Sequence, residues 1–234
     1  MYMNDLVSVI IPSYDRFSYL LQAVDSVVNQ TYDAIEIIIV DDGSQDPRYK
    51  THNFPKNCKV IHIDREKIEG GPGSVRNHGT EISTGKWIAF LDDDDIWLPK
   101  KLEIQIETMQ HNEFQFSSTE GYFGEGRYNI NNSYQLYNDE KFYKKINKKF
   151  KGTKDYKKLY PRVWDLDFLK IHNCIITSSV IVERELFNSF GGFRNIPGAE
   201  DYDCWLGLLT RTNLIYINKP LFYYDGKHGD GRNY

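Results

Sequence analysis

The sequence predicts an α/β fold in which helices flank a mostly parallel sheet. Apolar, β-branched runs at residues 6–11 and 36–40 have the composition of strands buried on both faces. Between these runs, Leu20, Val24 and Val27 recur at helical spacing, so the first forty residues indicate a βαβ unit. Its crossover is expected to be right-handed.

The segments that follow are consistent with this class. Residues 129–161 are polar and aperiodic, and they are expected to form a variable insertion or loop. The regular segments predicted in order are a strand at 59–63, a glycine-rich turn at 70–73 and a helix at 74–82, a strand at 86–91, a helix at 100–109 opened by Pro99, a strand at 114–123, a strand at 175–182, helices at 184–190 and 200–211, and a strand at 214–217.

The composition excludes several classes of protein. Apolar residues make up 40% of the 234 residues, which is enough for a packed core and argues against disorder. No apolar stretch approaches the ~20 residues that a membrane-spanning helix needs, and no secretory signal is visible. Cys58, Cys174 and Cys204 are too scattered for a disulfide framework or a CxxC metal site. A single domain in a reducing, cytoplasmic setting is therefore expected.

The charge is unevenly distributed along the chain. The net charge is −4, but residues 141–158, which begin at Lys141 and end at Lys158, hold nine lysines and one aspartate. This tract is either a solvated surface segment or a contact for an anionic partner, such as a lipid head group at a membrane surface. No nucleic-acid partner is expected, because the acidic remainder of the chain would repel nucleic acid.

Four consecutive aspartates follow the predicted strand at 86–91. Carboxylates packed together raise one another's pKa unless a cation neutralises them. The side chains of Asp92 and Asp94 point to the same side of an extended segment, and Mg²⁺ or Mn²⁺ takes one or two protein carboxylates together with phosphates and water. The spacing favours a Mn²⁺ or Mg²⁺ site; an acidic turn that caps a helix is the alternative interpretation.

A second acidic strand end, at Asp41 and Asp42, is expected beside the first. Ligands of open α/β sheets bind beyond the carboxyl ends of the strands, so both acidic ends would line one crevice. A metal-bound nucleoside diphosphate would satisfy both ends. The dinucleotide fingerprint is missing, because Pro12 and its neighbours stand where G-x-G-x-x-G is required, and no P-loop motif is present.

Six motifs resemble those of the inverting family 2 glycosyltransferases, which have the GT-A fold. In chain order they are VSVIIPSYDR, EIIIVDDGS, GGPGSVRNHG, GKWIAFLDDDDIW, TSSVIVERELFNSFGGF and GAEDYDCWL. Residues 110–173 match no part of the family pattern. The resemblance implies one GT-A domain over residues 1–234, in which about 1–112 bind the nucleotide sugar and about 113–234, with the variable insertion, bind the acceptor.

The resemblance also implies the donor site. Asp94 falls on the metal ligand, and His228 falls on a further metal ligand through a C-terminal match whose spacing is looser than in the family. Asp93 stands where the family often has a small residue. The implied nucleotide-binding residues are Pro12, Tyr14, Asp15, Asp42, Arg76, Asn77, Asp92 and Asp93, with Pro12 and Tyr14 flanking the base and Asp42 on the uracil of a UDP-sugar.

Inverting transfer requires a carboxylate that takes a proton from the attacking acceptor hydroxyl. The resemblance places this catalytic base at Asp201, at the start of a predicted helix whose dipole favours an ionised carboxylate. Glu200 and Trp205 are expected to contact the acceptor, which would be a glycan, a lipid-linked saccharide or a protein. Two alternatives stay open: an inactive nucleotide-sugar-binding relative and a metal-dependent phosphotransferase.

Overall fold

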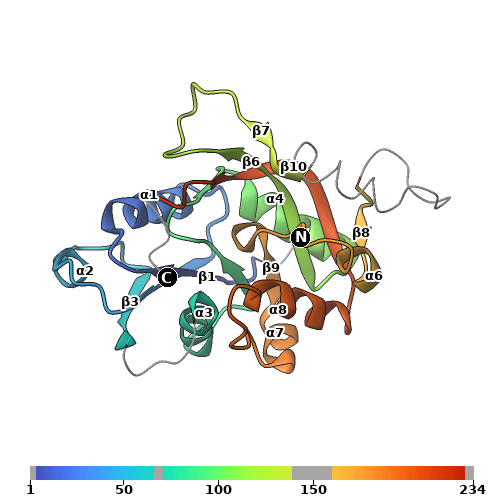
Figure 1. The fold of residues 1–234 in the computed structure, drawn as a ribbon, viewed down its shortest axis with the longest axis horizontal. Helices are drawn as coiled ribbons and strands as arrows, with labels where there is room; N and C mark the ends of the chain where they lie inside the picture. Colours follow the sequence, from blue (N-terminus) through green and yellow to red (C-terminus); the bar gives the residue numbers. More distant parts are fainter. Residues whose placement is uncertain (1–3, 66–70, 139–159, 230–234) are drawn as a thin grey trace.

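The computed structural model describes residues 4–65, 71–138 and 160–229, and these residues form one ten-stranded sheet with helices on both faces (Figure 1). The strands are β1 (Val7–Ser13), β2 (Ile35–Asp41), β3 (Cys58–His62), β4 (Trp87–Phe90), β5 (Ile96–Trp97), β6 (Phe116–Gly124), β7 (Gln135–Leu136), β8 (Val163–Trp164), β9 (Ile181–Glu183) and β10 (Leu214–Asp225). The helices are α1 (Phe17–Val28), α2 (Arg48–Thr51), α3 (Pro72–Glu81), α4 (Lys101–Asn112), α6 (Leu166–Leu169), α7 (Arg184–Phe190) and α8 (Glu200–Leu209).

The strand order is β3-β2-β1-β4-β9-β6-β10-β5, with β7 paired to β6 and β8 paired to β10. The first four strands in this order are parallel, which confirms the predicted βαβ unit. The second half is mixed: β9 runs antiparallel to both β4 and β6, whereas β6 and β10 are parallel. The α/β class is confirmed. The apolar runs predict that the strands are buried, but they do not predict the direction in which each strand runs, so the mixed half of the sheet was not predicted.

Both faces of the sheet are covered, as the continuous apolar runs predict. Side chains alternate along each strand, so Ile10 and Ile38 pack toward α3, α7 and α8, while Val9 and Ile37 pack toward α1 and α4. Figure 1 shows these two helical layers on opposite sides of the sheet. The aspartates at 92–95 directly follow β4, whose carboxyl end lies beside that of β1 in the parallel half of the sheet.

The prediction did not include α2, α6, β7 or β8, and three other segments also differ from it. The expected strand at 175–182 contains a 3₁₀ turn (Thr177–Ser179) before the short β9. The expected strand at 214–217 continues to Asp225, with register shifts around Pro220. The two-residue strand β5 follows the aspartates at once and pairs with β10. No helix among the described residues has both the length and the apolar character needed to cross a membrane.

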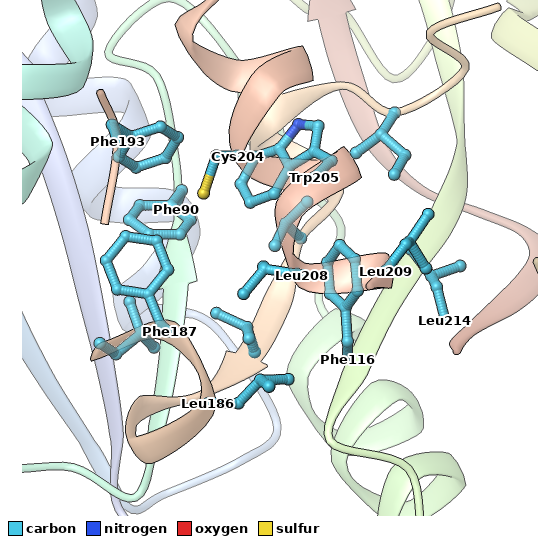
Figure 2. Packing of buried hydrophobic residues seen from close by; sticks show 14 of the residues in the cluster. Phe90, Phe116, Leu186, Phe187, Phe193, Cys204, Trp205, Leu208, Leu209 and Leu214 are labelled. Atoms are coloured by element: carbon cyan, nitrogen blue, oxygen red, sulfur yellow. The ribbon is translucent and has the colours of Figure 1, made fainter. Parts of the chain in front are cut away.

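Trp205 lies in the apolar core between the sheet and α8 (Figure 2). It is 0% exposed, and its ring centroid lies 5.4 Å from that of Phe193, 5.8 Å from that of Phe116 and 6.1 Å from that of Phe90. The prediction that Trp205 contacts an acceptor is therefore wrong. Asp201 lies at the start of α8, beside a pocket. Trp205, one helical turn later on α8, is covered by the sheet.

Candidate functional site

A pocket of about 530 Å³ lies at the carboxyl ends of β1 and β4. The start of α3, the loop before α8 and the turn that follows β10 complete its walls. The predicted site residues that line it are Pro12, Arg76, Asp92, Asp93, Asp94, Glu200, Asp201 and His228. Both predicted halves of the chain therefore contribute side chains to one pocket.

Tyr14 and Asp42 lie outside the pocket lining and share a contact with Arg65. The Arg65 guanidinium lies over the Tyr14 ring, 4.1 Å from its centroid, and Arg65 Nη1 lies 3.6 Å from Asp42 Oδ2. Burial raises the pKa of the Asp42 carboxyl, and the Arg65 charge opposes that shift. A carboxylate and an aromatic ring, joined by one arginine, thus stand together at the ends of β1 and β2.

Asp15 and Asn77 have structural partners. Asp15 adopts a left-handed backbone (φ 49°), and its Oδ1 accepts a hydrogen bond from the Gln45 amide at 2.7 Å, which holds the loop after β2. The side-chain Nδ2 of Asn77 donates to the Phe193 carbonyl at 2.8 Å, and its Oδ1 accepts from the backbone amide of Phe193 at 2.9 Å. Asn77 therefore ties α3 to the loop that precedes α8, and neither side chain lines the pocket.

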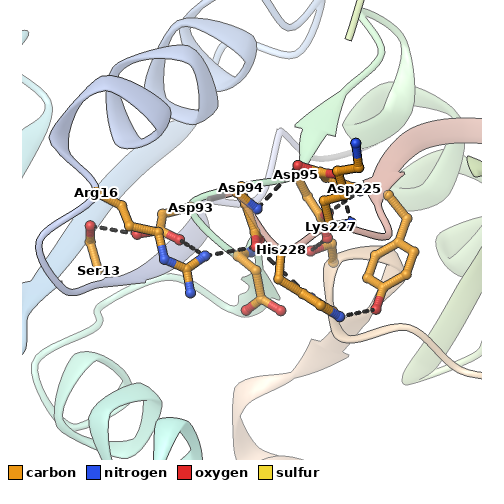
Figure 3. A network of polar contacts seen from close by, with 12 residues as sticks. Ser13, Arg16, Asp93, Asp94, Asp95, Asp225, Lys227 and His228 are labelled. Atoms are coloured by element: carbon orange, nitrogen blue, oxygen red, sulfur yellow. Dashed lines mark hydrogen bonds and ion pairs between the residues drawn. The ribbon is translucent and has the colours of Figure 1, made fainter. Parts of the chain in front are cut away.

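Two arginines hold the aspartates that follow β4. Arg76 from α3 pairs with Asp92. Asp93 accepts hydrogen bonds from Ser13 Oγ at 2.6 Å and from Arg16 Nη1 at 3.2 Å, and the same Nη1 lies 2.7 Å from Asp94 Oδ2. Figure 3 shows Arg16 lying between Asp93 and Asp94.

Burial dominates the electrostatics of this run. It raises the pKa of Asp93 to about 7 and that of Asp94 to about 6, with repulsion from neighbouring aspartates adding to the shift and Arg16 opposing it. Both carboxyls line the pocket, and their ionised forms are disfavoured because burial removes water from the charge. A positive charge beside these carboxylates favours their ionised form, and Arg16 supplies one.

Asp95, the fourth aspartate, is 0% exposed and anchors other elements. Its carboxylate accepts from Ser178 Oγ at 2.5 Å and from the Asp225 amide at 3.0 Å. The Asp225 carboxylate in turn accepts from the Lys227 and Gly229 amides at 2.9 and 3.1 Å, which fixes the turn after β10 (Figure 3). Sequence reasoning missed both residues, because their partners are far away in the chain.

His228 projects from this turn toward Asp94. Its backbone is left-handed (φ 54°), and its Nδ1 lies 4.0 Å from Asp94 Oδ2. The Tyr224 hydroxyl lies 3.4 Å from His228 Nε2 on the other side of the ring. The C-terminal motif thus brings an imidazole to the aspartate predicted to bind metal, even though its spacing is loose.

A divalent cation in this pocket would need oxygen or nitrogen donors from the side chains that line it. Within residues 4–65, 71–138 and 160–229, no group of three or more His, Cys, Asp or Glu side chains is arranged to hold a metal ion. Mg²⁺ and Mn²⁺ in nucleotide sites take only one or two protein ligands and complete their shell with phosphate oxygens and water. The carboxylate of Asp94 and the imidazole of His228 fit that smaller requirement.

Asp201 and Glu200 open α8 at the pocket wall. Burial raises the pKa of the Asp201 carboxyl, while the Tyr202 amide and the charge of Arg76 oppose the shift. A Cβ on Gly73 would lie 2.8 Å from Glu200 Cγ, so glycine is required where the start of α3 approaches the start of α8. This approach places the helix-start carboxylates on the same pocket as the strand-end aspartates.

Sequence reasoning also missed Arg16 and Arg194, which line the pocket. Arg16 is one of the residues that directly follow β1, where ligands of such sheets bind, and that position was its only signal. Arg194 lies in the loop before α8, where its guanidinium pairs with Asp203. No spacing or composition in the sequence marks that loop as part of a site.

The chain resembles known proteins along most of its length. The family model for Glycosyl transferase family 2 matches residues 8–180. An uncharacterized glycosyltransferase of Rickettsia bellii is 35% identical over 218 residues, which cover 92% of this chain and 28% of that protein. Escherichia coli WfgD, named as a UDP-Glc:alpha-D-GlcNAc-diphosphoundecaprenol beta-1,3-glucosyltransferase, is 32% identical over 221 residues, which cover 92% of this chain and 75% of WfgD.

Solved structures share the fold at lower identity. The crystal structure of S. aureus TarS has a TM-score of 0.69 at 19% identity, over 94% of this chain and 36% of TarS. The structure of TarS 1–349 in complex with UDP-GlcNAc has a TM-score of 0.68 at 18% identity, over 94% of this chain and 58% of that one. The fold is that of the GT-A glycosyltransferases.

The chain spans 28% of the length of the Rickettsia bellii relative and 75% of the length of WfgD. Its likeness to the family nevertheless runs through every element that builds the pocket wall up to Thr177. The family match covers the first four of the six motifs almost completely, and the chain belongs to glycosyl transferase family 2.

Proposed function

We propose that this chain is a metal-dependent inverting glycosyltransferase that moves a sugar from a nucleoside-diphosphate donor, a UDP-sugar, to an acceptor hydroxyl. One observation carries the proposal: the aspartates that follow β4 and the carboxylates that open α8 line the same pocket. The family membership and the UDP-GlcNAc complex of TarS, which shares the fold, support the same donor class.

Asp201 is the proposed catalytic base. Its carboxylate takes the proton of the acceptor hydroxyl while that oxygen bonds to the anomeric carbon and the bond from this carbon to the diphosphate oxygen breaks. Burial raises the pKa of Asp201, which makes the ionised carboxylate a stronger base. Its position in the first turn of α8 keeps the ionised form accessible, because the helix dipole favours negative charge there.

The donor side is proposed to use the first half of the chain. Tyr14 and Asp42 would hold the base, with Arg65 between them, and Arg76 and Asp92 would face the ribose and the diphosphate. Asp94 and His228 would hold Mn²⁺ or Mg²⁺. The bound ion would neutralise the charge that develops on the departing diphosphate.

The acceptor is proposed to approach from the second half of the chain, beside Glu200. WfgD and a second E. coli relative, WfaP, are named for a GlcNAc-diphosphoundecaprenol acceptor, which favours a lipid-linked saccharide among the acceptors considered. Such an acceptor would bring the enzyme to a membrane surface. The lysine-rich tract at 141–158 lies outside the described residues, so its contact with an anionic surface stays a prediction.

Donor hydrolysis across a panel of nucleotide sugars tests the proposal. We expect one UDP-sugar to be hydrolysed with Mn²⁺ or Mg²⁺ and to be stable in EDTA, because water can replace the acceptor slowly. A matched reaction with Asp94→Asn should show the loss that EDTA causes. Binding of UDP without turnover of any sugar, with or without candidate acceptors, would contradict the proposal and favour an inactive nucleotide-sugar-binding relative.

A further inference from the structure

Arg16 places a positive charge on the wall of the pocket. Its side chain is only 7% exposed, and its Nη1 contacts both Asp94 Oδ2 at 2.7 Å and Asp93 Oδ1 at 3.2 Å. Its backbone is held as well, because the Arg16 amide donates to the Tyr49 hydroxyl at 3.0 Å and its carbonyl accepts from Leu20 at the start of α1. The guanidinium is therefore directed at the aspartates by a rigid element.

The contact with Asp94 uses the carboxylate oxygen that faces His228. Asp94 Oδ2 is 2.7 Å from Arg16 Nη1 and also 4.0 Å from His228 Nδ1, the other proposed ligand. A divalent cation on this oxygen would stand within a few ångströms of a guanidinium, and two cations that close in a buried site repel each other strongly. The two cannot share Asp94 Oδ2 without a cost.

We propose that Arg16 is a positioning residue that occupies the place of the divalent cation on Asp94 in the nucleotide-free protein. It leaves Asp94 when the cation and the donor diphosphate bind together, and it keeps its contact with Asp93. This inference rests on the proposed metal-dependent function. It adds that the cation binds weakly by itself and more tightly when the donor diphosphate is present.

The Asp93 contact is what makes this exchange reversible. Asp93 also accepts from Ser13 Oγ at 2.6 Å, so it stays fixed when Arg16 moves off Asp94. Held there, Arg16 still lines the pocket and keeps a positive charge near the phosphate oxygens of a bound donor, for which a guanidinium is well suited. Metal and nucleotide binding are coupled through one side chain, and such coupling is reciprocal.

Titration of Mn²⁺, with free Mn²⁺ measured by electron paramagnetic resonance, tests this inference without any reference to turnover. Arg16→Gln should bind Mn²⁺ in the absence of nucleotide at least about tenfold tighter than the wild type, because no charged hydrogen bond must be broken first. The strengthening of Mn²⁺ binding by UDP should be correspondingly smaller in Arg16→Gln than in the wild type.

Two variants serve as controls. Arg16→Lys keeps a positive charge beside Asp94 and should bind Mn²⁺ alone as weakly as the wild type. Lys86→Gln removes one positive charge from an exposed pair with Asp5 at the opposite end of β4, and it should leave Mn²⁺ binding unchanged. Arg16→Met, which keeps the aliphatic stem, replaces Arg16→Gln if that variant does not fold.

The outcomes separate this inference from the proposed function. If the wild type binds Mn²⁺ with UDP but Arg16→Gln shows no gain in affinity for Mn²⁺ alone, the role of Arg16 is wrong and the metal site stands. If no variant binds Mn²⁺ even with UDP, the metal site itself is wrong, and the inference fails with it.

Discussion

Asp201 is subject to two opposing influences at the scale of a single residue. Burial raises the pKa of its carboxyl, whereas the Tyr202 amide and Arg76 favour the ionised form. The Asp201 carboxyl therefore holds a proton more tightly than an ordinary aspartate, which is the direction of shift that suits a general base.

Replacement of Asp201 with asparagine tests the role of the base. Asp201→Asn should keep UDP affinity within about twofold and lose at least about 100-fold in kcat, since general bases contribute on that order. Glu200→Gln, which changes the adjacent carboxylate in the same pocket, is the matched control and should retain most of its kcat. UDP titration calorimetry and a transfer assay measure both quantities; turnover retained by Asp201→Asn would remove it from this role.

The raised pKa of Asp201 predicts the pH dependence of turnover. The base must be ionised, so kcat should fall as the pH is lowered through this pKa, and the midpoint should lie above the ordinary value of 3.8. The profile is measured at saturating donor and Mn²⁺, so that weaker donor binding at low pH does not lower the measured kcat. A kcat that stays constant down to pH 4 would contradict the assignment.

At the scale of elements, the pocket depends on how closely α3 approaches α8. A Cβ on Gly73 would lie 2.8 Å from Glu200 Cγ and 2.9 Å from Phe193 Cβ, and Phe193 is buried in the core. Gly73→Ala should therefore destabilise the fold by about 1–3 kcal/mol, as overpacking does, and lower kcat by displacing the start of α8. Thermal unfolding and the transfer assay measure the two effects.

Gly71 is the matched control for this substitution. It lies two residues earlier on the same pocket wall, and a Cβ there would meet nothing within 4 Å. Gly71→Ala should leave the melting temperature unchanged. An equal fall in melting temperature in both variants would show that the close approach of α3 to α8 is not the reason why glycine is needed at position 73.

The turn after β10 provides a second element-scale prediction. The Asp225 carboxylate accepts three amide hydrogen bonds, from Gly126, Lys227 and Gly229. Asp225→Ala should release the turn that presents His228 and raise the donor KM about tenfold or more, because charge-assisted bonds of this kind contribute about 1.5–3 kcal/mol each. Lys227→Ala removes only an exposed side-chain pair with Glu125 and should leave the donor KM unchanged.

The sequence predicted the parts of the site that local pattern encodes. Asp92 and Asp94 follow from the acidic strand end and Asp201 from the family resemblance, and the structure brings all three to one pocket. Arg16 could not be assigned in this way, because its partners lie 77 and 78 residues away and only the sheet brings them together. Trp205 was misassigned because helical spacing predicts which residues share a face of the helix but does not predict what packs against that face.

At the scale of the whole molecule, ligand binding should stabilise the fold through both halves of the sheet. A ligand present at 100 times its Kd adds about 2.7 kcal/mol, which corresponds to a rise of about 5–10 °C in a chain of this length. UDP with Mn²⁺ should give a rise of that size in thermal unfolding, and UDP with EDTA a much smaller one. Equal shifts would show that the cation does not join nucleotide and protein.

The position of β10 has a consequence for how the protein is made. β10 lies between β6 and β5, and its Asp225 amide is a partner of buried Asp95, so the sheet cannot close until Leu214–Asp225 has been synthesised. During translation, β6 therefore waits with an open edge, a state prone to wrong pairing. Ribosome-bound chains halted before residue 214 should be protease-sensitive, and protection should appear only after residue 225 leaves the exit tunnel.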